Sequence, residues 1–265
     1  MEIGPAADGL PRPAMLAPPL ETKKTLSERL KERWFDDADH PYCHFEREIE
    51  RQLEPQHVLL EVGCGRRAEL VRRFAGRAAD LVGLDLVAPD QDVAAGLAGG
   101  TVRLVRGDVA ATGLPDASVD LMISRALMEH VREPQPVFDE VRRVLKPGGK
   151  YVFLAPNLCD YGALLAKLVP NRLHPTIVRW TEGRDARDTF PAWFRCNTRR
   201  ALRRLCARSG LELASLRYLG QYPAYFLFNP LLFTLASAYE KLISRFEALG
   251  FLRGWILVVI KKPAE

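Results

Sequence analysis

A short apolar run that ends in two glycines, within residues 57–67 (HVLLEVGCGRR), largely decides which folds are open to this chain. Residues 57–62 predict a strand buried on both faces, because apolar side chains fill most of its positions. Gly63 and Gly65 end that strand and, lacking a Cβ atom, allow a sharp turn and the close approach of a ligand to backbone N–H groups. A helix is predicted from Ala68 onward. This order of elements predicts an α/β fold with a cofactor at the glycine turn.

Two acidic residues are expected near that turn. Glu61 would lie at the carboxyl end of the first strand, facing the crevice of an open α/β sheet, where a carboxylate repels a pyrophosphate and favours a cationic ligand. Residues 80–85 (DLVGLD) predict the next buried strand, and Asp85 follows Gly65 by 20 residues. An acid at this distance is where nucleoside-binding folds accept the ribose hydroxyls.

The composition fits one large α/β domain with insertions. The chain has 265 residues, of which 48% are hydrophobic and 27% are charged, as is ordinary for a globular protein. The formal net charge of +5 is compatible with acidic partners or an anionic membrane surface but requires neither. The five cysteines are scattered and form no C-x-x-C pair, so we expect no metal site, no disulfide framework, and a reduced, cytoplasmic compartment.

Four further motifs follow in order. Residues 101–106 predict a third strand that leads into Gly107-Asp108-Val109, and residues 114–124 (LPDASVDLMIS) predict a turn and a fourth strand, in which we expect a structural role for Asp120. The remaining two motifs are LMEHV at 127–131 and VLKPGG at 144–149, the latter a helix stop before a fifth strand at 150–155.

Together with Glu61-Val62-Gly63-Cys64-Gly65, these motifs resemble the class I S-adenosylmethionine-dependent methyltransferases over residues 57–157. The resemblance is to the small-molecule branch that includes enzymes of ubiquinone and menaquinone biosynthesis. It implies a Rossmann-like α/β fold: a seven-stranded, mostly parallel sheet with one antiparallel strand, helices on both faces and helical cap insertions. One departure is Arg67, which stands where the family usually has a third glycine.

The resemblance also implies S-adenosyl-L-methionine as the cofactor. Asp108 would face the adenine amino group, and the backbone N–H that follows it would meet the ring. The residues expected to bind the cofactor are Glu61, Gly63, Cys64, Gly65, Asp85, Leu86, Asp108, Val109 and Ser124.

The rest of the chain is divided around this core. We expect a disordered, proline-rich arm at 1–21, N-terminal helices within 22–56 (at 22–35 and 41–53), and the cofactor-binding core at 57–157. An insertion at 158–197 is the candidate substrate cap, because insertions after the fifth strand lie over the crevice. Residues 198–265 would hold a helix that runs to Ser209 and is stopped by Gly210, two strands at 211–219 and 251–262, and an apolar insertion at 220–250.

The insertion at 220–250 is unusual because residues 222–239 carry ten large apolar side chains and no charge. Asn229 is predicted as an N-cap, with Pro230 at the first position of an amphipathic helix that runs to about Leu249. Packing of its apolar stripe on the protein's own domain is the default expectation, while a dimer interface and contact with a membrane surface stay open. The stripe comprises Leu231, Leu232, Leu235, Tyr239, Leu242, Ile243 and Phe246.

The chemistry that these features favour is in-line methyl transfer to a small-molecule, lipid-like or glycan-linked acceptor. His130, after the fourth strand, is the first candidate for a general base, although a packing or capping role is at least as plausible for it. Lesser candidates are Arg125, Tyr161 and His174. A nucleic acid is not expected as a partner, because the Asn/Asp-Pro-Pro-aromatic run of base-methylating enzymes does not follow the fourth strand, and the basic face of the helix at 198–209 lacks interleaved aromatic residues.

Two other classes of function remain open at this level. Gly63-x-Gly65-x-x-Ala68 also fits the dinucleotide fingerprint of a nicotinamide-dependent oxidoreductase, against which Glu61 and Asp108 argue. A non-catalytic protein that keeps the methyltransferase fold as a scaffold is the other class, and Arg67 is its only support in the sequence.

Overall fold

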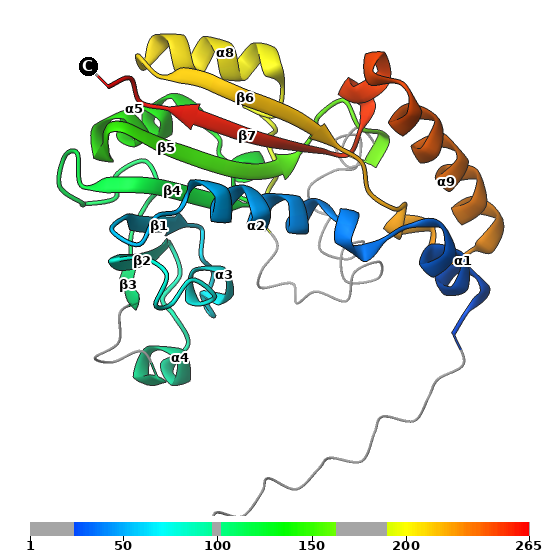
Figure 1. Cartoon of the computed structure of the whole chain (residues 1–265), viewed down its shortest axis with the longest axis horizontal. Helices are drawn as coiled ribbons and strands as arrows, with labels where there is room; N and C mark the ends of the chain where they lie inside the picture. Colours follow the sequence, from blue (N-terminus) through cyan, green and yellow to red (C-terminus); the bar gives the residue numbers. More distant parts are fainter. Residues whose placement is uncertain (1–23, 97–101, 163–189, 265) are drawn as a thin grey trace, which may run out of the picture.

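The computed structural model describes residues 24–96, 102–162 and 190–264. A seven-stranded sheet with the order β3-β2-β1-β4-β5-β7-β6 runs through it (Figure 1). Strand β7 is antiparallel to both β5 and β6, and the other neighbouring strands are parallel, so the predicted fold class is confirmed. The strands are β1 (Val58–Val62), β2 (Asp80–Asp85), β3 (Val102–Arg106), β4 (Val119–Arg125), β5 (Leu145–Pro156), β6 (Glu212–Leu219) and β7 (Trp255–Lys261).

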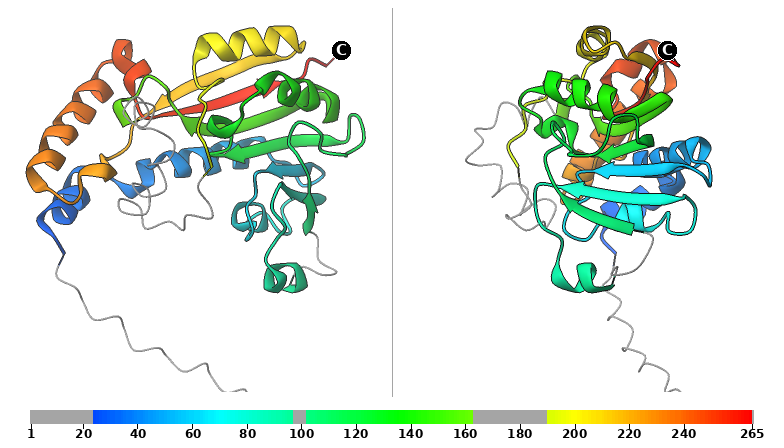
Figure 2. Two further views of the ribbon diagram at one scale, coloured as in Figure 1. Left: turned by 180° about the vertical axis from the view of Figure 1, so that it is seen from behind. Right: turned by 90° about the vertical axis from the view of Figure 1, so that its left-hand side faces the viewer.

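Helices cover both faces of this sheet (Figure 2). On one face lie α2 (Pro41–Gln52) and α3 (Glu69–Arg72), and on the other lie α5 (Pro134–Val144) and α8 (Arg199–Arg208). The remaining elements are α1 (Leu26–Trp34), α4 (Gln91–Gly96), α9 (Pro230–Arg245), and the 3-10 turns η1 (Asp37–Asp39), η2 (Met128–His130), η5 (Ala224–Phe226) and η6 (Glu247–Leu252). The predicted arm at 1–21 and most of the predicted cap, including His174, lie outside the described residues.

Two apolar layers hold the helices on the sheet. Phe45 and Ile49 of α2 are fully buried on one face, as their helical spacing predicts. Phe138 of α5 and Leu202 of α8 are fully buried on the other face. Burying each such side chain contributes about 1.5–3 kcal/mol. The apolar periodicity of the sequence therefore decides which side of each of these helices meets the sheet.

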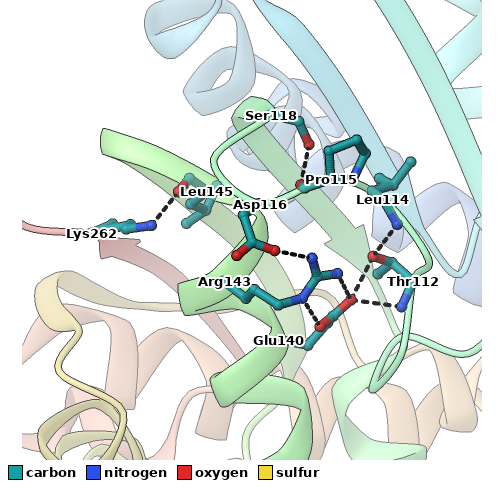
Figure 3. Close-up of polar contacts among 9 residues, drawn as sticks. All are labelled: Thr112, Leu114, Pro115, Asp116, Ser118, Glu140, Arg143, Leu145 and Lys262. Atoms are coloured by element: carbon teal, nitrogen blue, oxygen red, sulfur yellow. Dashed lines mark hydrogen bonds and ion pairs between the residues drawn. The ribbon is translucent and has the colours of Figure 1, made fainter.

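A polar clamp joins the loop before β4 to α5 (Figure 3). The carboxylate of Glu140 accepts hydrogen bonds from the backbone N–H and the hydroxyl of Thr112 at 2.7 and 2.6 Å, and pairs with Arg143. Arg143 also donates to Asp116 at 2.5 Å. The guanidinium of Arg143 is the main reason that the pKa of Glu140 falls to about 2. This clamp fixes the turn from which β4 starts.

The residue that opens β4 has the structural role expected for it. Asp120 accepts a hydrogen bond from the backbone N–H of Val58 at 2.8 Å and one from the ammonium of Lys146 at 2.6 Å. It thereby joins the starts of β1, β4 and β5, at the edge of the sheet opposite the carboxyl ends of its parallel strands.

Local boundaries differ from the prediction at three places. Helix α3 has only four residues, because the chain turns at Arg73 and again at Gly76, whose φ of 76° a helix cannot continue. Strand β5 begins at Leu145 rather than at residue 150, because Leu145 already pairs with Val119 of β4; a register shift then leaves residues 146–149 without a partner in β4 before Lys150 pairs with Leu121. The last strand begins at Trp255 rather than at residue 251, because η6 occupies residues 247–252.

Helix α9 begins at the predicted residue, but its predicted apolar stripe is turned toward solvent and not toward the protein. Asn229 caps it, accepting from the backbone N–H groups of Leu231 and Leu232 at 3.0 and 3.1 Å. Its last residue is Arg245, four positions before the predicted end. The expectation that its apolar stripe packs on its own domain is wrong, since most of the stripe is exposed to solvent and the residues buried are Phe233, Ser237, Glu240 and Ile243.

The reason for this orientation is an aromatic contact with α1. The ring of Phe233, which the predicted stripe omits, stacks on Trp34 with centroids 6.4 Å apart and also meets the edge of Phe35. Only a different rotation of α9 would bury Leu231 and Leu235, and it would break both contacts. On α1 itself, Leu26 is 58% exposed although its spacing places it with Leu30 and Trp34.

Candidate functional site

A cleft of about 1140 Å³ opens at the carboxyl ends of β1, β2 and β4. This volume exceeds that of a typical drug-sized site and leaves room for a nucleoside cofactor together with a second molecule. Nine of the ten residues that the sequence predicts for the site line it. They are Glu61, Gly63, Cys64, Gly65, Asp85, Leu86, Asp108, Val109 and His130.

The glycine loop after β1 has backbone angles that only glycine adopts without strain. Gly63 has a φ of 73° and Gly65 a φ of 67°. A Cβ atom on Gly63 would lie 3.0 Å from the Leu127 side chain, whereas a Cβ atom on Gly65 would meet no atom within 4 Å. Gly65 therefore leaves its backbone open to the cleft. The Arg67 side chain is 71% exposed, so the loop accommodates the missing third glycine without burying the guanidinium.

Glu61 lies in the wall of the cleft and is only 4% exposed. One of its carboxylate oxygens accepts a hydrogen bond from the backbone N–H of Val71 at 2.8 Å, which ties α3 to the end of β1. Burial raises the pKa of Glu61 to about 7, while the nearby Arg125 opposes that rise. A cation bound in the cleft would stabilise the ionised carboxylate. Helix α3 has only four residues, so it adds no long helix dipole to this wall of the cleft. The wall is formed mainly by the glycine loop and the neighbouring acids.

Asp85 connects the ends of the first three strands. Its carboxylate accepts from the backbone N–H groups of Gly65 at 2.8 Å and of Val87 at 2.9 Å. Its carbonyl oxygen accepts from the N–H of Gly107 at 2.9 Å, which sets the turn that presents Asp108. Asp108 is exposed, and it accepts from the N–H of Ala110 at 2.9 Å in a tight turn of its own. Both carboxylates therefore lie at fixed positions along one edge of the cleft.

Apolar side chains lie next to these acids. Leu86 is 59% exposed although it directly follows a buried strand, and Val109 lines the same cleft from the turn after β3. An exposed leucine beside a carboxylate suits a nucleoside, whose base can pack on the leucine while its ribose hydroxyls bond to the carboxylate. The thiol of Cys64 is no nucleophile at neutral pH, because burial raises its pKa to about 12.

Ser124 is the expected cofactor residue that the structure places elsewhere. It is fully buried, and its hydroxyl is 2.7 Å from the hydroxyl of Tyr151, inside the layer between β4 and α5. Its side chain does not line the cleft, because alternate residues of a strand point to opposite faces and Ser124 falls on the core face of β4. The expectation therefore fails for its side chain.

The far wall of the cleft forms where residues 190–194 dock on the turn after β4. The N–H of Trp193 donates to the carbonyl of Glu129 at 2.7 Å. The Nδ1 atom of His130 lies 3.1 Å from the carbonyl oxygen of Pro191, and its ring meets Phe190 edge-on. Because a carbonyl oxygen only accepts hydrogen bonds, Nδ1 is the donor in this contact; in the neutral form of the ring the lone pair is then on Nε2, which lies 3.8 Å from a carboxylate oxygen of Glu129.

Comparison with known proteins adds an independent observation. Residues 60–153 match the family described as "Methyltransferase domain". These residues hold the glycine loop, Asp85, Asp108 and His130, on a seven-stranded sheet with one antiparallel strand, as the resemblance implies. Residues 60–153 are thus similar to a methyltransferase domain, in agreement with the motifs of the sequence.

Two curated relatives and one solved structure are similar to it. A protein of Mycolicibacterium smegmatis, described as a probable S-adenosylmethionine-dependent methyltransferase, is 34% identical over 103 residues, which are 37% of this chain and 38% of that protein. The ubiquinone biosynthesis O-methyltransferase of Pectobacterium atrosepticum is 29% identical over 150 residues, 49% of this chain and 62% of that enzyme. The chain thus spans less than two thirds of either relative.

The solved structure shares the fold. It is the geranyl diphosphate C-methyltransferase of Streptomyces coelicolor in complex with S-adenosyl-L-homocysteine and other ligands. It has a TM-score of 0.54 and 18% identity, with 83% of this chain and 75% of that chain covered.

Several residues in the wall of the cleft carried little or no signal in the sequence. The guanidinium of Arg125 lies 4.5 Å from the centre of the Tyr42 ring, and that of Arg132 lies 5.3 Å from the Trp193 ring. Each pair joins elements distant in the chain, so no local motif reports it. Tyr161, a lesser candidate, does not line the cleft; its ring packs against Phe226 and Tyr239 of the insertion.

Proposed function

We propose that this protein is an S-adenosylmethionine-dependent methyltransferase whose acceptor is a small or lipid-like molecule with an apolar part. One observation carries the proposal. The sheet brings Gly65, Asp85 and Asp108 to adjacent strand ends around one cleft, with two of them joined by a hydrogen bond of 2.8 Å. The two acids and the glycine loop thus line one cleft that is large enough for a nucleoside.

The chain's own residues divide the work of binding. Asp85 would accept the ribose hydroxyls, Asp108 would accept the adenine amino group, and Leu86 and Val109 would pack on the ring. Glu61 would stabilise the positive charge, since its ionised form is favoured next to a cation. The cofactor supplies a methyl group already activated on a sulfonium. The protein therefore mainly contributes alignment, which can lower a barrier by about 7–11 kcal/mol in favourable cases.

The far wall of the cleft supports the acceptor class. Tyr42, Phe190 and Trp193 supply aromatic surface, and two of these rings carry a stacked guanidinium. Aromatic walls of this kind bind planar or chain-like apolar groups. His130 would take the proton of an acceptor that must lose one, through Nε2, while Pro191 holds the ring by Nδ1.

A thermal shift experiment tests the cofactor. S-adenosylhomocysteine at a hundredfold its dissociation constant should add about 2.7 kcal/mol of stability. For a chain of this size this corresponds to roughly 5–10 °C in melting temperature. A shift with NAD alone would favour the oxidoreductase, and a shift with neither ligand would favour a non-catalytic scaffold.

The acceptor class needs a separate assay. Release of S-adenosylhomocysteine would be followed with phenolic and quinol acceptors, with a lipid-linked glycan, and with transfer RNA as the negative comparison. Turnover is expected with the apolar small molecules or the lipid-linked glycan. Turnover with transfer RNA alone would contradict the proposed acceptor while leaving the cofactor assignment intact.

A further inference from the structure

The insertion between β6 and β7 exposes an unusual amount of apolar surface. Eight of its large apolar side chains are between 40% and 68% exposed. Single exposed apolar residues are common, but a contiguous group of them is typical of a surface that binds a membrane, another protein or an apolar ligand. We call this group the apolar face; it comprises Tyr225, Phe228, Leu231, Leu232, Leu235, Leu242, Phe246 and Phe251.

The geometry of α9 makes this face a continuous stripe. At about 100° per residue, Leu231, Leu235 and Leu242 fall within about 40° of arc on one side of the helix. The helix is 16 residues long, which corresponds to about 24 Å. Phe233 and Ile243 are buried on the opposite side, so rotating the stripe inward would expose them instead. The packing of α9 therefore keeps the apolar face exposed to solvent.

The exposed charges of α9 itself have one sign. Lys241 and Arg245 are exposed on α9 at the edge of the stripe. The one acidic residue of the helix, Glu240, is 3% exposed. The next acid along the chain, Glu247, pairs with Arg253 at 3.3 Å. An apolar stripe with a cationic edge is complementary to a bilayer that carries anionic headgroups.

Helix α9 lies at the end of the sheet toward which the parallel strands β4 and β5 run, which is the end where the cleft opens (Figure 1). Trp255, where the insertion ends, pairs with Pro156 at the carboxyl end of β5. The ring of Tyr42 meets Trp255 with centroids 5.7 Å apart, and Arg125 of the cleft stacks on that same tyrosine. A surface bound through α9 would therefore lie beside the site and not behind the sheet.

We propose that α9 and its flanks form a peripheral membrane-binding surface that lies on an anionic phospholipid bilayer. Contact is interfacial, since none of the helices in the described residues has the length and apolar content to cross a bilayer. A second copy of the chain fits the surface less well. A two-fold interface would place the same patch on both sides, and the exposed part of α9 offers cations without acids to pair with them.

Vesicle flotation tests this proposal without requiring methyl transfer. The wild-type protein is expected to float with vesicles of phosphatidylcholine and phosphatidylglycerol in equal parts, and less with phosphatidylcholine alone. A variant with Leu231→Glu, Leu235→Glu and Leu242→Glu should lose roughly tenfold or more of its bound fraction. Its melting shift with S-adenosylhomocysteine should stay at the wild-type value, which shows that the core is intact.

A control variant with the same change in net charge distinguishes a loss of binding caused by the α9 stripe from one caused by the lower net charge of the protein. Arg203→Gln, Arg204→Gln and Ala207→Glu on the exposed face of α8 also lower the net charge by three, and this variant should float like the wild type. The proposal is overturned if the wild type does not float, if the α9 variant floats unchanged, or if the α8 variant loses binding. It is equally overturned if light scattering finds a wild-type dimer that the α9 variant converts to a monomer.

Discussion

The carboxylate of Asp85 accepts a hydrogen bond from the backbone N–H of Gly65 at 2.8 Å, across 20 residues of sequence. The end of β2 thus holds the loop that follows β1. The proposed ribose-binding residue and the glycine turn are therefore one unit, because a change in the acid alters both the ligand contact and the loop that presents the backbone N–H groups.

Replacing Asp85 by Ala is expected to weaken S-adenosylhomocysteine binding by roughly 10- to 150-fold. A hydrogen bond to a charged group contributes about 1.5–3 kcal/mol, and the alanine leaves the Gly65 N–H without this acceptor. Asp85→Asn keeps an acceptor for that N–H and should fall between wild type and alanine. Titration calorimetry measures the three affinities. The exposed Asp92, on α4 and away from the cleft, provides the control Asp92→Ala; wild-type affinity in Asp85→Ala would rule out the assignment.

The two loop glycines should respond differently to alanine. Gly63→Ala combines a left-handed backbone, which costs about 1–2 kcal/mol, with a Cβ atom 3.0 Å from Leu127. Gly65→Ala has the same backbone strain but open space around the new methyl group, so its stability loss should be smaller and its loss of cofactor affinity larger. Urea unfolding and ligand titration measure the two effects. Gly148→Ala, with a φ of 80° and no contact within 4 Å, reports the backbone strain alone, and equal behaviour of all three variants would contradict the prediction.

Glu240 should make the protein less stable as pH rises. Burial, reinforced by Asp160, raises its pKa from 4.5 to about 8. Between these two pH values the folded protein binds a proton that the unfolded chain releases. The contribution of Glu240 is thus fully present below about pH 4.5 and is lost as pH rises through about 8, with a slope of up to about 1.4 kcal/mol per pH unit.

Glu240→Gln is expected to remove that slope. Urea unfolding at several pH values between 5 and 8 would show the variant gaining stability on the wild type toward the alkaline end. Glu247→Gln is the matched control, because Glu247 is 93% exposed and its substitution should leave the pH dependence unchanged. Wild-type and Glu240→Gln curves that run parallel across this range would show that Glu240 does not titrate as proposed.

Much of the core could be predicted because its information is local. The order of strands and helices, the glycine turn and the acids that follow β1, β2 and β3 each occupy a few consecutive residues. The carboxyl ends of parallel neighbouring strands must meet at one edge, so predicting the strands also brings Asp85 and Asp108 together. The cap at 158–197 could be recognised only as an insertion, because its sequence repeats no motif of the core.

The sequence by itself determined the strands, the turn glycines, the caps such as Asn229, and the resemblance of the core to methyltransferases, since each depends on backbone preferences or on spacing within one segment. Only the tertiary structure decided which side of α9 faces the protein, that Ser124 bonds to Tyr151 instead of lining the cleft, and that Arg125 stacks on Tyr42. These outcomes depend on partners 27 to more than 190 residues away, and the stacking of Phe233 on Trp34 outweighed the apolar periodicity of the helix itself. Periodicity reports that a helix has an apolar side, and the neighbouring elements determine what that side meets.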